Sequence, residues 1–248
     1  PDYLPDNEPT RREFAHLQKS IEHVDDGVAR ILDALEQTGQ AENTLVIFTA
    51  EHGLPVPRAK GTLYDPGIQV AFLARWPRRI APGSVSGSLT SNLDVMPTLL
   101  EAANAQIPTR VQGRSLLPLL LGKSADSGRE AVFAEKTYHE HYDPIRCVRT
   151  EHLKYIRNFA DRPRLVMPSD VYNSPTRQSM GEDERFWSHR PAEELYDLTA
   201  DRGEVSNLAG SPEHREELGN LRARLEEWMQ ETADPLLKGP VPRVAPQF

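Results

Sequence analysis

The 248-residue sequence has a single cysteine, Cys147, so it can form neither an internal disulfide nor a cysteine pair for redox chemistry or zinc. It has no apolar run close to the roughly 20 residues that span a bilayer. Residues 1–6 show neither the basic nor the apolar segment of an export signal. No Asn-x-Ser/Thr sequon is present, so a bacterial periplasmic, extracellular or cytoplasmic protein is favoured over a glycosylated lysosomal one.

Basic residues are in the minority, because 29 Lys and Arg face 37 Asp and Glu, for a formal net charge of -8. A nucleic-acid backbone requires a clustered basic face, so no nucleic acid partner is expected, and no membrane partner either. The hydrophobic and charged shares, 38% and 27%, are typical of a soluble globular protein. An anionic small substrate would need a local cationic pocket.

The first half of the chain reads as alternating helices and buried strands. Thr10 and Glu13 form a capping-box pattern, and apolar residues then recur at helical spacing from Phe14 to Leu35. The apolar run 44–49 follows, and a second lies at about 68–76. Runs of this kind favour strands that are buried on both faces, as in parallel α/β sheets.

The second half shows shorter strands. One is predicted at 131–136, and a hairpin is predicted from 145–149 and 154–157. Residues 160–192 have little periodicity and are interpreted as a long loop. A final amphipathic helix follows Ser211. This pattern indicates a small antiparallel α+β subdomain.

Candidate metal-binding and anion-binding residues follow the apolar run 44–49. Glu51 offers carboxylate oxygens to a hard cation, His52 offers a ring nitrogen, and Gly53 allows a sharp turn. Ligands bind at the carboxyl ends of strands in open α/β sheets. Lys60 follows a proline-stiffened loop and could place a positive charge on an anion. An ordinary polar strand end and a solvated lysine are the alternative interpretation.

Read together, these segments resemble the type I sulfatases of the alkaline phosphatase superfamily, over nearly the whole chain. The matching segments are 4–6, 43–49, 51–53, 60–64, 75–77, 94–98, 113–118, 154–158 and 194–198. Within that family the chain is most similar to the heparan N-sulfatases, or N-sulfoglucosamine sulfohydrolases, at 53–57, 138–140, 170–176 and 231–235.

The resemblance implies a site that binds a divalent cation and the sulfate group of the substrate. Glu51 and His52 fall on the positions that bind a divalent cation, expected to be Ca²⁺. Lys60 falls on the catalytic position that contacts the sulfate. Glu51 stands where the family usually has aspartate, and its extra methylene shifts the carboxylate, so metal affinity or activity could differ.

The resemblance also implies substrate-binding roles for Arg58, His139 and Glu140. His139 and His141 would share a face of a strand, so a metal site and a plain surface hydrogen-bonding role are alternatives. Several arginines are either solvated on strand faces or form a subsite for a sulfated glycan. They are Arg146, Arg149, Arg157, Arg162 and Arg164.

The implied fold class is α/β. Residues 1–123 would form the rear half of an alkaline-phosphatase-like mixed or parallel sheet domain, and 124–248 the antiparallel subdomain with its closing helix. The family's nucleophile is a formylglycine made from a Cys/Ser-x-Pro-x-Arg motif, and the residues after Cys147 do not match it. The nucleophile is therefore expected in a preceding half of the same enzyme.

The implied function of the complete enzyme is hydrolysis of sulfate esters or sulfamates on sulfated sugars, N-sulfoglucosamine among them. The alternatives are a phosphonate or phosphodiester hydrolase of the same superfamily and a non-catalytic homologue that binds sulfated glycans. The isolated chain is expected to be inactive. It is also expected to leave an apolar face at 46–48 uncovered, because the strand lacks neighbours.

Overall fold

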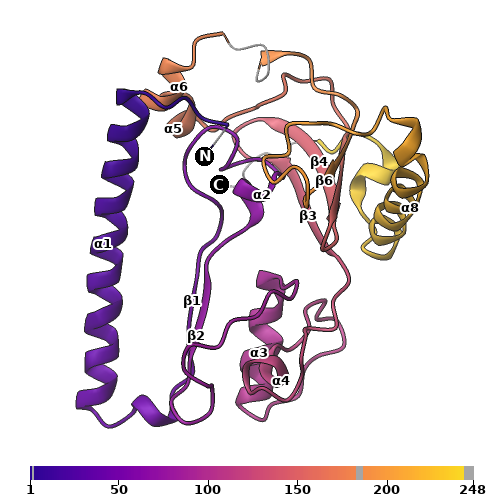
Figure 1. Ribbon diagram of the computed structural model, residues 1–248. Helices are drawn as coiled ribbons and strands as arrows, with labels where there is room; N and C mark the ends of the chain where they lie inside the picture. The colour runs from indigo at the N-terminus through magenta and orange to yellow at the C-terminus, as the bar shows by residue number, and fades with distance from the viewer. Residues whose placement is uncertain (2, 183–186, 243–248) are drawn as a thin grey trace. The chain divides into compact units, whose positions relative to one another are not determined.

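The computed structural model describes residues 1, 3–182 and 187–242 and divides into two compact units (Figure 1). We call Arg11–Glu51 with Val70–Val132 the hairpin unit. We call Pro1–Thr10, His52–Gln69 and Phe133–Phe248 the sheet unit. The two units differ from the predicted division near residue 123 chiefly because the segment after Glu51 packs with the C-terminal sheet.

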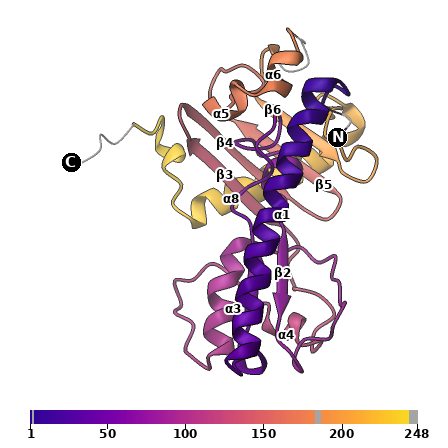
Figure 2. The same ribbon diagram turned by 90° about the vertical axis from the view of Figure 1, so that its left-hand side faces the viewer.

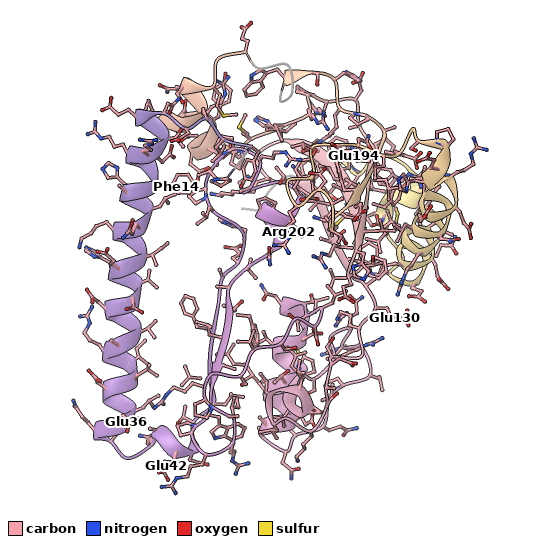
Figure 3. All side chains as sticks on the ribbon, viewed as in Figure 1. Phe14, Glu36, Glu42, Glu130, Glu194 and Arg202 are labelled. Atoms are coloured by element: carbon pink, nitrogen blue, oxygen red, sulfur yellow. The ribbon has the colours of Figure 1, made fainter. Side chains whose placement is uncertain are left out.

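The long helix α1, Glu8–Gln37, starts two residues before the predicted cap. The backbone N–H of Thr10 donates to Asn7 Oδ1 at 3.1 Å, so Asn7 closes the first turn and Thr10 lies inside it. Asparagine is among the best residues for this position, which explains why it overrides the Thr10 pattern. At the other end of α1, Glu36 pairs with Arg75 at 2.8 Å, and Glu36 can be found in Figure 3.

The hairpin unit contains a two-stranded sheet of β1, Val46–Thr49, and β2, Phe72–Arg75. The strands pair antiparallel, with Ile47 opposite Ala74. The parallel arrangement that the apolar runs suggested is therefore wrong for this pair. An apolar run is typical of a strand that is covered on both faces in the complete sheet, but it carries no information on strand direction, which the connection between the strands decides.

The apolar residues of this pair are not buried. Val46, Ile47 and Phe48 are all partly exposed, and Leu73 on β2 is 65% exposed. On α1, Ile21 and Ile31 are 58% and 61% exposed. This agrees with the expectation of an uncovered apolar face in the chain on its own.

The rest of the hairpin unit is helical. The 3-10 turn η1, Ala41–Asn43, precedes β1, and η2, Asn92–Asp94, leads into α3, Val95–Ala102. The short helix α4 spans Leu117–Leu120. No helix in the described part of the chain has the length and apolar character needed to cross a membrane.

The sheet unit is built on four strands in the order β3-β4-β5-β6 (Figure 2). The strands are β3 Val132–Tyr138, β4 Tyr142–Arg149, β5 Leu153–Asn158 and β6 Glu193–Asp197. The β4–β5 and β5–β6 pairs are antiparallel. The predicted hairpin of 145–149 with 154–157 is confirmed, because a period of two and a polar turn are both local signals.

Each face of this sheet is covered. Helix α8, Arg215–Glu231, contacts β4 and β5, and the Trp228 ring stacks on Phe133 with centroids 5.0 Å apart. The opposite face forms a core that joins the strands to segments from the N-terminal half and from the loop before β6. This core contains Leu63, Tyr64, Ile145, Cys147, Ile156, Leu165, Met167, Val171, Tyr196 and Leu198.

Several short elements complete the sheet unit. They are α2 Asp65–Ile68, α5 Ser169–Tyr172, α6 Pro175–Ser179, η3 Pro212–His214 and η4 Pro235–Lys238. Helices α5 and α6 lie inside the segment 160–192 that was interpreted as loop. Residues 183–186 of that segment lie outside the described residues.

Candidate functional site

The segment that leaves β1 is pressed closely against α2. Gly53 N–H donates to Gly67 O at 3.0 Å, and a Cβ on Gly53 would lie 1.7 Å from Pro66 O. Only glycine fits at this distance. The backbone therefore requires Gly53, which explains the glycine after the acid-histidine pair without reference to chemistry.

Glu51 and His52, which precede this glycine, are both exposed. His52 Nδ1 lies 2.7 Å from Gly53 O. A carbonyl oxygen can only accept, so the proton sits on Nδ1 and the lone pair of Nε2 is left free. A histidine whose other nitrogen donates to a backbone carbonyl is the usual form of a metal-ligating histidine. His52 is thus suited to be a ligand.

Lys60 ends a tight loop that starts at Leu54. Its backbone N–H donates to Leu54 O at 3.1 Å, and Val56 and Ala59 within the loop are buried. The Lys60 side chain is 19% exposed and its Nζ lies 2.7 Å from Asp170 Oδ2. The sequence prediction that a stiff loop carries Lys60 is confirmed, while Asp170 as its partner was not predicted.

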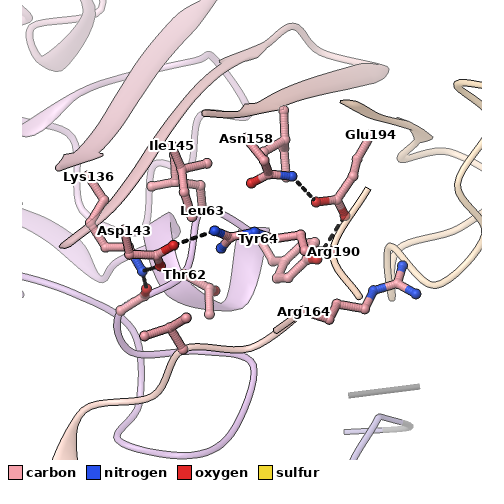
Figure 4. A pocket seen from close by; sticks show the side chains of 13 residues that line it. Thr62, Leu63, Tyr64, Lys136, Asp143, Ile145, Asn158, Arg164, Arg190 and Glu194 are labelled. Atoms are coloured by element: carbon pink, nitrogen blue, oxygen red, sulfur yellow. Dashed lines mark hydrogen bonds and ion pairs between the residues drawn. The ribbon is translucent and has the colours of Figure 1, made fainter. Parts of the chain in front are cut away.

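The residue after Lys60 is held by a buried polar group. Lys136 Nζ donates to Gly61 O at 2.5 Å and forms an ion pair with Asp143. Asp143 also pairs with Arg190 (Figure 4). Burial lowers the pKa of the Lys136 ammonium, and the Asp143 carboxylate counters that shift. This buried network anchors the backbone directly beside Lys60.

Lys136, Asp143 and Arg190 line the pocket drawn in Figure 4, and a second buried network lies along the same pocket. The Glu194 carboxylate accepts hydrogen bonds, both at 2.8 Å, from the Tyr64 hydroxyl and from Asn158 Nδ2 (Figure 4). It also accepts one from the Tyr196 hydroxyl. Burial and the neighbouring Glu194 raise the pKa of Tyr64 to about 12, so this hydroxyl stays a donor. A satisfied polar network of this kind specifies one arrangement of the core.

Glu140 and His139 lie in the turn between β3 and β4. The Glu140 carboxylate accepts from the backbone N–H of Ser169 at 3.0 Å and from its hydroxyl at 2.8 Å. These bonds from Ser169 hold the pKa of the Glu140 carboxyl below its usual range. A small pocket is lined by His139, Glu140, Gly61 and Pro168 among others, so the structure brings the predicted His139–Glu140 pair next to the Lys60 loop.

Arg58, predicted to bind substrate, is bound to backbone oxygens of the protein itself. Its side chain is buried, with 4% exposure, and its guanidinium donates to the backbone oxygens of Gly203 and Glu204. It also stacks on the Tyr64 ring, 4.0 Å from the centroid. The geometry gives Arg58 a structural role that ties the Lys60 loop to residues 203–204, and it does not support the predicted contact with substrate.

Two of the clustered arginines, Arg146 and Arg149, form ion pairs with aspartates of the sheet unit. Arg146 is fully buried and holds both oxygens of Asp234, with Nη2 to Oδ1 at 3.1 Å. Arg149 pairs with Asp65 at 3.2 Å. Solvation on a strand face is therefore wrong for Arg146, which is fully buried. Arg149 is partly exposed and lines a pocket with His152 and Arg202, so its role in a glycan subsite stays a prediction.

Sequence reasoning missed three residues around Lys60: Asp170, Ser169 and Lys136. Asp170 was part of a family-like segment, but no periodicity or spacing indicated its partner. Lys60, His139 and Glu140 all lie in the sheet unit, whereas Glu51 belongs to the hairpin unit. The order of these residues in the sequence also predicts that the loop brings Lys60 back beside Glu51 and His52 at the end of the strand, and this convergence stays a prediction. In the described ranges, no three His, Cys, Asp or Glu side chains cluster so as to hold a metal ion.

Comparison with known proteins places this arrangement in a family. A family described as N-sulphoglucosamine sulphohydrolase, C-terminal, matches residues 51–178, just over half of the chain and all the candidate site residues. The chain belongs to this sulfatase family. The matched range contains Lys60, the His139–Glu140 pair and Asp170.

Individual relatives agree with this assignment. An ulvan-active sulfatase of Formosa agariphila is 31% identical over 94% of this chain and 41% of its own length. Human N-sulphoglucosamine sulphohydrolase is 31% identical over 97% of this chain and 52% of its own length. The solved structure of a 2-O GAG sulfatase has a TM-score of 0.72 and 27% identity, covering 92% of this chain and 45% of that chain. The chain thus spans about half the length of the relatives it matches.

Proposed function

We propose that the protein containing this chain is a sulfatase that hydrolyses sulfate esters or sulfamates on sulfated sugars, with N-sulfoglucosamine as a candidate substrate. The observation that carries the proposal is Lys60, a lysine on a tight, buried loop within the sulfatase-family match. Its ammonium pairs with Asp170, and the next residue, Gly61, lines a pocket together with His139 and Glu140. The named activities of the relatives support it.

In this proposal Lys60 neutralises the negative charge that develops on the sulfate oxygens. A charge held in place before the reaction stabilises the transition state without reorganisation at the moment of reaction. The buried loop and the anchored Gly61 carbonyl restrict the Lys60 backbone, so the ammonium needs little further ordering. His139, which is exposed and lines the small pocket beside Gly61, would contact the sugar.

Glu51 and His52 would hold the divalent cation, expected to be Ca²⁺, with the carboxylate and with Nε2. When bound, the cation would add to the electrostatic stabilisation of the sulfate. Further ligands and the formylglycine nucleophile are expected from residues outside this chain.

The proposal predicts turnover by the full-length protein and none by this chain. We expect the full-length protein to release sulfate from a chromogenic aryl sulfate and from N-sulfoglucosamine, measured as inorganic sulfate. Purified residues 1–248, assayed at the same concentration, should not exceed a heat-inactivated sample. A full-length protein that instead cleaves a phosphonate monoester and no sulfate ester would favour the phosphonate hydrolase alternative, and one that binds sulfated glycans without turnover would favour the non-catalytic one.

The metal assignment makes a separate prediction. Glu51→Ala in the full-length protein should weaken Ca²⁺ binding, measured by isothermal titration, and excess Ca²⁺ should partly restore activity. The matched control is Glu42→Ala, an exposed carboxylate on η1 that pairs with Arg78. Equal Ca²⁺ affinity in the Glu51→Ala variant and the wild type would remove Glu51 from the metal site.

A further inference from the structure

Lys60 is held at its tip by a residue far away in the sequence. Its Nζ lies 2.7 Å from Asp170 Oδ2, and the Lys60 side chain is only 19% exposed. The hydrogen bond from Lys60 holds the pKa of the Asp170 carboxyl below its usual range, so this carboxyl is ionised at neutral pH. Charge-assisted bonds of this length are strong and directional. The Lys60 ammonium therefore has one preferred position, set by Asp170.

Asp170 is itself held by the residue before it. Ser169 begins the short helix α5, and both its backbone N–H and its hydroxyl donate to the Glu140 carboxylate. Glu140 lies in the β3–β4 turn, which is fixed by the antiparallel sheet. On the other side Pro168 packs against Gly61, where a Cβ would lie 3.1 Å from its ring. The start of α5 is therefore clamped between the sheet and the Lys60 loop.

From this geometry we infer that Asp170 is a positioning residue for Lys60, and that Glu140 acts on Lys60 through Ser169 and Asp170 rather than by touching the substrate. The inference rests on the proposed sulfatase function of Lys60. Removing the Asp170 carboxylate leaves the lysine charge in place but lets its long chain take other conformations. The transition state then loses an aligned charge while ground-state binding changes little.

A double-mutant cycle on the full-length protein tests this. Asp170→Asn is expected to lower kcat roughly 10- to 100-fold, as for a small misplacement of a catalytic group, with KM changed by no more than about twofold. In a Lys60→Ala background the same substitution should change kcat by less than about twofold, because its target is gone. Asp170→Glu should retain more activity than Asp170→Asn. Glu140→Ala should follow Asp170→Asn in direction and also lose its effect in the Lys60→Ala background.

The matched control is Asp161→Asn, which removes the same charge from a carboxylate that is 81% exposed and paired with His189. It should leave kcat and KM unchanged. Equal losses from Asp170→Asn in the wild-type and Lys60→Ala backgrounds would overturn the inference, as would a rise in KM with unchanged kcat, because Asp170 would then contact the substrate by itself.

A second measurement does not depend on activity, and it separates failure of this inference from failure of the proposed function. Lysines labelled with ¹³C at Cε report how rigidly each ammonium is held, and the Lys60 signal is assigned by its loss in Lys60→Ala. We expect Asp170→Asn, but not Asp161→Asn, to move that signal to the position and linewidth of a free lysine. An unchanged Lys60 signal would overturn the positioning role even in an active sulfatase. A changed signal in a protein without sulfatase turnover would support the positioning role and overturn the proposed function alone.

Discussion

Replacing Lys154 by methionine is expected to lower the free energy of unfolding by about 3–5 kcal/mol, the range for removing one partner of a buried ion pair. Lys154 is fully buried, and its Nζ pairs with Asp65 and with Glu204 at 2.7 Å. Methionine keeps most of the length of the side chain but leaves the buried Glu204 carboxylate without the lysine, and leaves Asp65 with Arg149 as its remaining cation. Urea denaturation of the wild-type and variant chains measures the difference.

Two further variants make this result specific. Lys19→Met removes a lysine that is 68% exposed and paired with Glu22, so its effect should stay within about 1 kcal/mol. Burial raises the pKa of Glu204, so this carboxyl accepts a proton more readily than a free one. Adding Glu204→Gln to Lys154→Met should therefore restore part of the lost stability. A loss below about 1 kcal/mol in Lys154→Met alone would show that the pair is not a determinant of stability.

The second large effect concerns Lys60 in the full-length enzyme. Lys60→Ala is expected to lower kcat by about 10²–10³-fold, the cost of removing one aligned charge or donor from a transition state, with a much smaller change in KM. Initial rates over a range of aryl sulfate concentrations separate the two constants. The Lys60 ammonium pairs with Asp170, a carboxylate that is 51% exposed, and not with a buried charge, so the thermal midpoint should stay close to that of the wild type.

Lys123→Ala is the matched control, because Lys123 is an exposed lysine in the hairpin unit and has no place in the proposed site. It should keep wild-type constants. If Lys60→Ala raised KM and left kcat unchanged, Lys60 would bind ground state and transition state alike. Wild-type constants in Lys60→Ala would remove it from the chemistry altogether.

Locally encoded features could be predicted from the sequence. The β4–β5 hairpin and the apolar stripe of α8 appear where the pattern placed them. Both depend on periodicity within a short window, 2.0 for strands and 3.6 for helices. The expectation of an uncovered apolar face at 46–48 also agrees with the structure, because it follows from a local apolar run and from strand neighbours that the run would need for full burial.

The sequence did not determine how strands and charges pair over long distances. It indicated that the runs at β1 and β2 are apolar, but the antiparallel register came only with the chain path between them. Arg146 looked like a surface charge until the fold placed it on Asp234, 88 residues away. A side chain's partner depends on tertiary geometry, and sequence separation carries no signal for it.

The same distinction applies to the candidate site. The sequence by itself, through its resemblance to the type I sulfatases, determined that Glu51, His52, Gly53 and Lys60 belong to a sulfatase-like segment, because motif order and residue type are local. Only the tertiary structure decided that Arg58 is bound to backbone carbonyls and that Lys60 faces Asp170, 110 residues further along the chain. The physical reason is that folding brings these charges into a partly desolvated space, where each must find a partner, and the fold decides which partner is within reach.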